Sequence, residues 1–266
     1  MNQSEIERVA RKIFAASHAR APFERLRGAD APGSMGDAYR IQDEVHRLWE
    51  AKGDAGPLGG HKIALTSRAV QELCGVNQPA YGAIFARTIR RSPATLSATD
   101  FVHLGLEFEL AVEIGRDVPA DGAPFDRETI APFVATCMPA FELIEDRGAD
   151  YGDLDAESIL TDRCWCAGVV LGAPVTDWQG IDLAATPVAL TWNGEIVDEG
   201  IAGDSMGHPF EGLAWTANHL AAQGRALKKG DIVITGSALK TRFPAPGDTI
   251  SYAITGVGET VVQLES

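Results

Sequence analysis

No apolar run in the chain approaches the length needed to cross a bilayer, so the sequence predicts no membrane-spanning segment. The N-terminal stretch also lacks the apolar core of a signal peptide. Basic residues are in the minority, with 23 Lys and Arg against 37 Asp and Glu, and the formal net charge is −14. Because a nucleic-acid-binding face must be basic, we expect no nucleic-acid partner. Small substrates are not excluded, since an acidic surface can still hold a locally positive site.

Cysteine is scarce and irregularly spaced. The chain has four cysteines, which are Cys74, Cys137, Cys164 and Cys166. Without a C-x-x-C pair they indicate neither a disulfide framework nor a zinc site, and we expect a reduced, cytoplasmic protein. The sequence places no His near Cys164 or Cys166, so packing as small apolar side chains is favoured over catalysis. Internal repeats and low-complexity tracts are absent as well.

Residues 1–60 are predicted to be mainly helical. Ser4 and Glu7 have the spacing of a capping box for a first helix. A second helix, from about residue 37, is terminated by Gly53. A short strand, "HKIAL", and a short helix capped by Ser67 follow.

From about residue 100 the apolar period changes from 3.6 to 2. Strands are predicted in "GLEFELAVEIG", "PVALTWNGEIV", "GDIVITG", "GDTISYAITG" and "ETVVQLE". Asn193-Gly194 is a two-residue hairpin signal, and one helix runs from Pro209 to Gly224. Many strands with few helices predict an α+β fold, a mixed β-sandwich or roll, with an N-terminal helical region at 1–60 and a β-rich domain at 61–266.

The strand 105–115 carries carboxylates on one face. Glu107 and Glu109 project from the same side, about 6.5–7 Å apart along the backbone. Two such anions repel, and a hard divalent cation such as Mg²⁺, Mn²⁺ or Ca²⁺ would reverse that repulsion. The alternative is a solvated acidic face, which is normal for an antiparallel strand and which local spacing does not exclude. Glu142, in the apolar run "MPAFELIEDRG", is the candidate third ligand, whereas Glu113 is expected at the surface.

Five blocks occur in an order that resembles the fumarylacetoacetate hydrolase superfamily. They are "GHKIALTSRAVQELCGVNQPAYG", "LEFELAVEIG", "PAFELIEDR", "MGHPFEGLAWTANHLAAQG" and "GDIVITGS". The chain is most similar to the branch of 2-keto-4-pentenoate hydratases and 2-oxo-hept-3-ene-1,7-dioate hydratases, with related 4-oxalocrotonate decarboxylases. The resemblance runs from about residue 35 to the end, and it implies a fold of the fumarylacetoacetate hydrolase type.

The resemblance implies site residues. It assigns Glu107, Glu109 and Glu142 to Mg²⁺ or Mn²⁺, and it makes Lys62 a catalytic lysine, against the alternative of an ammonium that reaches water. An ammonium there adds positive charge and transfers protons if its pKa is depressed. We further expect Ser237, with nearby backbone N–H groups, to bind a substrate carboxylate, although a simple strand-ending turn has equal weight without the resemblance.

The implied function is that of a lyase, a metal-dependent hydratase in aromatic-compound degradation. It would add water to a 2-hydroxy-2,4-dienoate (2-keto-4-enoate) and give a 4-hydroxy-2-oxo acid. Alternatives are a 4-oxalocrotonate-type decarboxylase, another C–C bond-cleaving 2-oxo acid enzyme, or a non-catalytic partner subunit. The family also implies a homo-oligomer.

Three departures from the family pattern bear on this choice. Ala80 stands where these hydratases have an acidic residue used in proton handling. "DRCWC" replaces a stretch of small residues, so Arg163 and Trp165 reshape the pocket or, for Arg163, bind a second anionic group of the substrate. Lys240 is the candidate substitute for a family arginine.

Overall fold

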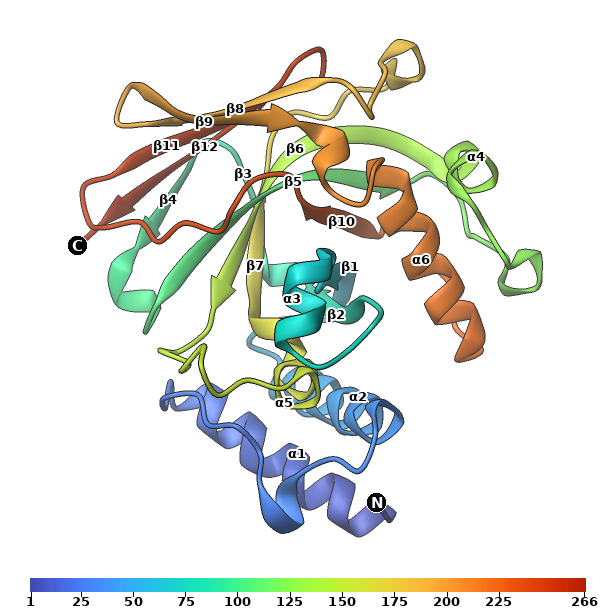
Figure 1. Cartoon of the computed structure of the whole chain (residues 1–266), viewed down its shortest axis with the longest axis vertical. Helices are drawn as coiled ribbons and strands as arrows, with labels where there is room; N and C mark the ends of the chain where they lie inside the picture. The colour runs from blue at the N-terminus through green and yellow to red at the C-terminus, as the bar shows by residue number, and fades with distance from the viewer.

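Two mixed β-sheets pack face to face, with helices at one end and along one side (Figure 1). The computed structural model describes residues 1–266. The larger sheet has strand order β2-β1-β10-β5-β6-β7-β3, and the smaller one β4-β12-β11-β8-β9. The predicted α+β sandwich or roll is therefore confirmed.

Twelve strands and six α-helices make up these layers. The strands are β1 Leu58–Ala64, β2 Ala80–Phe85, β3 Ile89–Arg91, β4 Ala94–Ser97, β5 Leu104–Ile114, β6 Val134–Glu145, β7 Cys166–Leu171, β8 Pro187–Trp192, β9 Glu195–Ile201, β10 Ile232–Ser237, β11 Thr249–Ile254 and β12 Gly258–Glu265. The helices are α1 Gln3–His18, α2 Met35–Lys52, α3 Arg68–Leu73, α4 Arg127–Ile130, α5 Ala156–Thr161 and α6 Pro209–Ala222.

The larger sheet curls, because β2 and β7 approach one another although they are not paired. Its concave face carries a small apolar cluster that includes Ile84, Ala111, Ala140 and Ile234. On its convex face, Phe108 and Phe141 contact Tyr252 of the smaller sheet in the main core. The curl therefore makes a concave surface that is separate from the core between the sheets.

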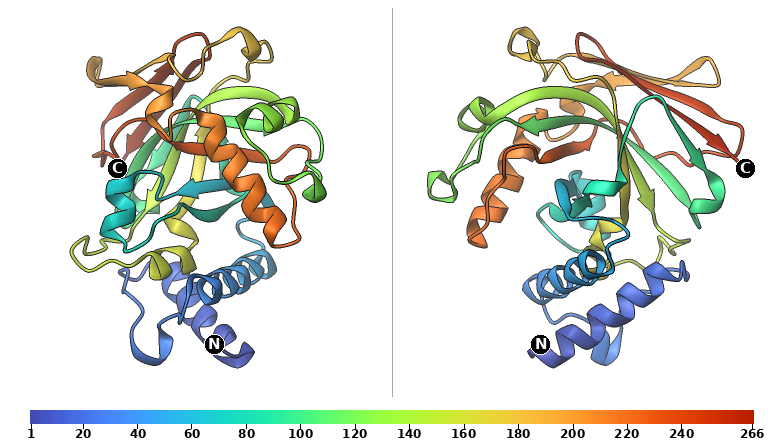
Figure 2. Two further views of the ribbon diagram at one scale, coloured as in Figure 1. Left: turned by 45° about the vertical axis from the view of Figure 1, so that its right-hand side comes forward. Right: turned by 180° about the vertical axis from the view of Figure 1, so that it is seen from behind.

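The first two helices form the helical region, which lies at one end of the molecule in all three views (Figures 1 and 2). They pack through Ile6, Val9, Ile41 and Val45. On each helix the buried apolar residues recur with the 3.6-residue period of an amphipathic helix. None of the helices combines the length and the apolar character that a bilayer crossing requires.

The start of α1 differs from the sequence-based expectation. Its cap is Asn2, whose side chain accepts from the Glu5 N–H while the Glu5 carboxylate accepts from Asn2 N–H. The capping box thus lies two residues before the predicted Ser4–Glu7 pair. Asn is as good a cap as Ser, and the earlier start adds helical residues before the apolar stripe.

Candidate active site

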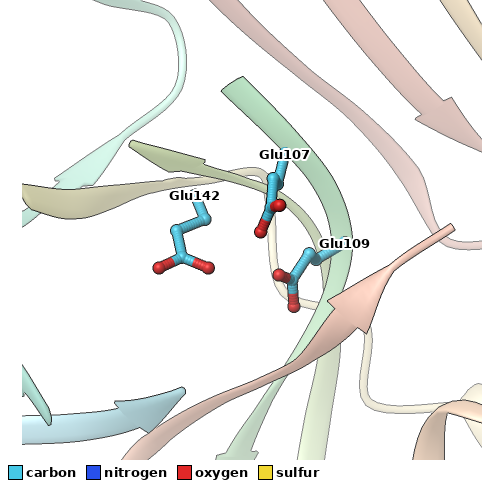
Figure 3. Close-up of side chains that lie close together, drawn as sticks. All are labelled: Glu107, Glu109 and Glu142. Carbon is cyan, nitrogen blue, oxygen red and sulfur yellow. The ribbon is translucent and has the colours of Figure 1, made fainter. Parts of the chain in front are cut away.

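Strand register brings the three glutamates together on the concave face. Strands β5 and β6 are antiparallel neighbours, and Glu107 lies directly opposite Glu142. Glu109 is two residues further along β5, so its side chain projects to the same side. Each glutamate offers one oxygen, and these oxygens lie within 4.8 Å of one another. Figure 3 shows the three carboxylates turned toward a common space.

Two buried oxygens of this cluster have no protein donor. Glu109 and Glu142 are completely buried, and Glu107 is half-buried. Oε1 of Glu109 and Oε2 of Glu142 accept no hydrogen bond, and the partner of Glu142 Oε1 is the Lys62 ammonium, 3.0 Å away. Buried carboxylates without partners are costly, and a hard divalent cation prefers such oxygens. The donor set therefore fits Mg²⁺ or Mn²⁺.

Two residues that the sequence did not single out hold the glutamates in place. The Gly236 N–H donates to Glu109 Oε2 at 2.6 Å. The Thr241 hydroxyl donates to Glu107 Oε1 at 2.9 Å. Both donors come from the segment around the end of β10, which pairs with β5. No local pattern marks them, because their role depends on pairing between distant strands.

Burial and repulsion between carboxylates raise the pKa values of Glu109 and Glu142. The pKa of Glu109 lies well above its usual value because of burial and the charges of Glu142 and Glu107. Burial, together with Glu107, raises the pKa of Glu142 to about 7 although Lys62 opposes the shift. Such shifts are typical of functional sites.

Lys62 is the buried counter-charge of the cluster. Only 2% of its side chain is exposed, and Nζ lies 3.0 Å from Glu142 Oε1. It also donates to the Cys164 carbonyl at 3.3 Å. Burial alone would lower its pKa, but the charge of Glu142 and its neighbours outweighs burial and raises it. The alternative of a lysine reaching water is thus wrong, and the condition for proton transfer, a depressed pKa, is not met in the metal-free protein.

Gly82 makes room for this lysine. It lies opposite Lys62 in the β1–β2 pairing. A Cβ at residue 82 would stand 2.9 Å from Lys62 Cγ and 2.9 Å from the Arg163 carbonyl oxygen. A larger residue would therefore displace the ammonium or the turn above it.

Ser237 lies at the end of β10, opposite Glu109. Its hydroxyl accepts from the Phe108 N–H at 2.8 Å and donates to the Leu239 carbonyl at 2.8 Å. These bonds explain the strand-ending turn. A contact between Ser237 and a substrate carboxylate stays a prediction.

Arg163 is near the site by its backbone, while its side chain turns away from it. Its guanidinium stacks on the rings of Trp49 and Phe85, with centroids 4.9 and 5.7 Å away. Successive residues of a strand project to opposite faces, so on β2 Gly82 and Ile84 lie on the face of Lys62 and Phe85 lies on the other. Arg163, which stacks on Phe85, is therefore on the face away from Lys62. A substrate contact by Arg163 also stays a prediction.

The remaining candidates are placed as follows. Ala80 is buried in an apolar cluster with Cys74, Leu160 and Cys164. Glu113 is half-buried on β5 and belongs to no acidic cluster. Lys240 is exposed.

Both cysteines of "DRCWC" are buried, and burial raises the pKa of each thiol. Protonated, buried thiols are poor nucleophiles. Their arrangement agrees with the predicted packing role.

Comparison with known proteins supports the resemblance. Residues 66–265 match the Fumarylacetoacetate (FAA) hydrolase C-terminal family. The 2-keto-4-pentenoate hydratase of Paraburkholderia phymatum is 32% identical over 260 residues, covering 97% of this chain and 96% of its own. The 2-hydroxyhexa-2,4-dienoate hydratase of Comamonas testosteroni is 28% identical over 261 residues, covering 97% of each chain.

A solved structure shares the fold. The 4-oxalocrotonate decarboxylase from Pseudomonas putida G7, complexed with magnesium and adipate, superposes with a TM-score of 0.90 at 24% identity. The match covers 99% of this chain and 98% of that chain.

Proposed function

The chain belongs to the fumarylacetoacetate hydrolase family, and from that premise we propose that it is a metal-dependent hydratase, a lyase of 2-hydroxy-2,4-dienoates. The product is a 4-hydroxy-2-oxo acid. The observation that carries this proposal is the buried group of three carboxylates with one ammonium, Lys62, beside them. Two hydratases aligned over nearly their full length support the choice of reaction.

Glu107, Glu109 and Glu142 would hold the ion, which we take to be Mg²⁺ or Mn²⁺. When bound there, a divalent ion supplies Lewis-acid polarisation to a 2-oxo or 2-hydroxy acid. Two structures of the P. putida decarboxylase are complexed with magnesium or calcium, which supports an ion of this hard class. The Gly236 N–H and the Thr241 hydroxyl orient two of the three carboxylates.

Lys62 stabilises negative charge that develops on the substrate oxygens. Its ammonium is held between Glu142 and the Cys164 carbonyl, so it needs no reorganisation when charge develops. In the overall reaction C5 of the dienol gains a proton, and water then adds its oxygen to C4. C3 gains the second proton while the 2-hydroxyl becomes a carbonyl, so one water is consumed.

The neighbouring surface suits the rest of such a substrate. Ala111, Ala140 and Ile234 form a buried apolar cluster on the same side of the sheet as the glutamates, and under this proposal it packs beneath the hydrocarbon part of the substrate. Under this proposal Ser237, at the rim of the metal cluster, contacts the substrate carboxylate.

A second candidate reaction is decarboxylation of an oxalocrotonate-like acid. The observation that favours it is the buried Ala80, at the position where the resemblance implies an acid for proton handling in hydratases. A 4-oxalocrotonate decarboxylase of Pseudomonas putida is 28% identical over 225 residues. A non-catalytic subunit is disfavoured, because a scaffold has no need to bury three carboxylates and an ammonium together.

The test is a substrate screen with Mg²⁺. Purified protein is mixed with 2-hydroxypenta-2,4-dienoate, 2-hydroxyhexa-2,4-dienoate and 4-oxalocrotonate, and the ultraviolet dienol band and released CO₂ are followed. Loss of the band without CO₂ supports hydration. Release of CO₂ assigns decarboxylation instead, and an unchanged spectrum with every acid contradicts the whole substrate class.

We also propose that the enzyme is a cytoplasmic homo-oligomer. The four free cysteines support a reducing compartment. Strand β9 is an edge of the smaller sheet and exposes Ile196, Val197 and Ile201, which is typical of an edge that pairs with another copy. Light scattering after gel filtration tests this, since a strictly monomeric protein would contradict it.

A further inference from the structure

A second cavity lies behind the Lys62 site, outside the concave face. It has a volume of about 240 Å³ and lies where the ends of α1 and α2 meet β3 and the turn before β7. Its walls include Trp49, Arg90, Arg147, Asp162, Arg163 and Trp165. Lys62 and the three glutamates do not line it, so it is separate from the site described above.

Four buried hydrogen-bond donors in these walls have no acceptor. They are Nε1 of Trp49, Nη1 of Arg90, Nε of Arg163 and Nε1 of Trp165. Unsatisfied buried donors are rare in native proteins and each is costly. Asp162, in the same wall, has Oδ1 without a donor, and its Oδ2 lies beside Arg147. Four donors exceed this one free acceptor, and they point to a ligand that supplies several acceptors.

Two guanidinium groups of the cavity, those of Arg90 and Arg163, have no carboxylate partner, because the carboxylates nearby are occupied by other groups. Arg147 pairs with Asp162 at 2.8 Å, and both are buried. Glu145 is occupied by backbone N–H groups, including those of Val102 and His103. At the edge, Arg20 lies 4.0 Å from Asp100.

Arg90 and Arg163 form no ion pair with any carboxylate of the chain. Burial lowers the pKa of Arg163 even though the charge of Asp162 opposes the shift. Stacking of the Arg163 guanidinium on Trp49 compensates for only part of the free-energy cost of burying its charge, because an aromatic face is a weaker partner than an anion. A buried guanidinium of this kind is stabilised most by an anion with two oxygens.

We propose that this cavity binds a small organic carboxylate. The guanidinium groups of Arg163 and Arg90 hold its oxygens, and the indole N–H groups of Trp49 and Trp165 donate to it. The ring faces of the two tryptophans contact its hydrocarbon part. An aromatic or unsaturated carboxylate fits better than a bare inorganic ion, because the cavity exceeds the size of such an ion and has flat apolar walls.

A ligand in this cavity would contact the turn that positions the catalytic lysine. Arg163, Cys164 and Trp165 all have left-handed backbone conformations, with φ of 57°, 49° and 61°. Such conformations are disfavoured for residues with a Cβ and persist only when the surroundings hold them. The same turn presents the Cys164 carbonyl to Lys62 Nζ. A carboxylate that binds Arg163 and Trp165 thus holds the turn that positions the lysine.

The test is calorimetric titration of metal-free full-length protein with benzoate, pyruvate and inorganic phosphate, with tryptophan fluorescence as a second readout. We expect benzoate to bind one-to-one and to change the fluorescence. Arg163→Met and Arg90→Met should each weaken benzoate at least about tenfold. Arg116→Met is the matched control, because Arg116 is exposed and stacks on Phe133 away from the cavity.

Several results would overturn the proposal. No benzoate binding up to about 10 mM would do so, as would binding that neither arginine variant weakens. Phosphate binding without benzoate would show that the class of ligand is wrong. If Glu109→Gln abolishes benzoate binding and both arginine variants keep it, the carboxylate binds at the glutamate site instead. Because Arg90 lies on an edge strand, Arg90→Met keeps the test decisive should Arg163→Met fold poorly.

Discussion

At the scale of single residues, buried oxygens without donors explain most of the site. Glu109 and Glu142 are held in place by their strands, yet Oε1 of Glu109 and Oε2 of Glu142 accept no hydrogen bond. In the metal-free protein this arrangement is a cost, which Lys62 offsets only in part. A cation that is coordinated by these oxygens would therefore also stabilise the folded protein.

Glu109→Gln separates function from stability. The amide keeps the shape of the side chain and removes one negative charge, so we expect turnover to fall at least about 100-fold. Without metal, the variant should unfold at the same or a higher temperature than the original protein, because repulsion among the carboxylates is reduced. Steady-state kinetics and thermal unfolding measure both effects. Glu113→Gln, on the same face of β5 but outside the cluster, is the control and should retain normal turnover.

The raised carboxyl pKa values predict how metal stabilisation depends on pH. The pKa of Glu142 is about 7 in the folded protein, above its ordinary value of 4.5. The folded protein thus binds more protons than the unfolded chain between these values, and metal-free stability falls as pH rises through about 7. Mg²⁺ competes with those protons, so the increase in Tm that it produces should grow from pH 6 to pH 8. An increase of equal size at every pH would contradict this.

Some of these residues could be predicted from the sequence and others could not. Glu107 and Glu109 follow from the two-residue period of a strand, and Glu142 was a candidate from its apolar run that the family resemblance then assigned to the metal. Gly236 and Thr241 were missed because they are more than 120 residues away along the chain and meet the glutamates only through strand pairing. The paired Lys62 ammonium was expected, but the direction of its pKa shift required the distance to Glu142.

At the scale of elements, periodicity and caps predicted most strands and helices. Gly53 ends α2 in a left-handed conformation as expected, and Asn193-Gly194 forms the β8–β9 turn. The order of strands could not be predicted in this way. For example, β1 pairs in parallel with β10 from far along the chain, and nothing local encodes that partner.

Gly60→Ala tests the β1–β10 pairing. A Cβ at residue 60 would lie 2.2 Å from the Ile232 carbonyl oxygen, which is backbone and cannot move aside easily. We expect a loss of about 2 kcal/mol or more in the free energy of unfolding, together with lower activity because β1 carries Lys62. Denaturant unfolding measures it. Gly180→Ala, where a Cβ would meet nothing within 4 Å, is the control, and an equal effect of both changes would contradict the pairing argument.

At the scale of the whole molecule, the helical region supports the site from behind. Gln42 of α2 donates to the carbonyls of Tyr81 and Leu160, and Ala38 packs against the cluster that holds Cys164. The sequence predicted a boundary at residue 60, and that division stays a prediction. These buried contacts indicate that the two parts fold together.

Removing residues 1–53 tests this dependence. The truncated chain should lose native near-ultraviolet circular dichroism and Mg²⁺ binding, because β2 and α5 lose the helix that covers them. A truncated protein that keeps both properties would show that residues 54–266 fold alone. The control is the full chain treated in the same way.

The most direct measurement is an anomalous difference map from crystals of the full-length protein grown with Mn²⁺. We expect one strong peak among the carboxylates of Glu107, Glu109 and Glu142, next to the Lys62 ammonium. A map with no peak there, while the three side chains keep their positions, would contradict the metal site and the hydratase proposal built on it.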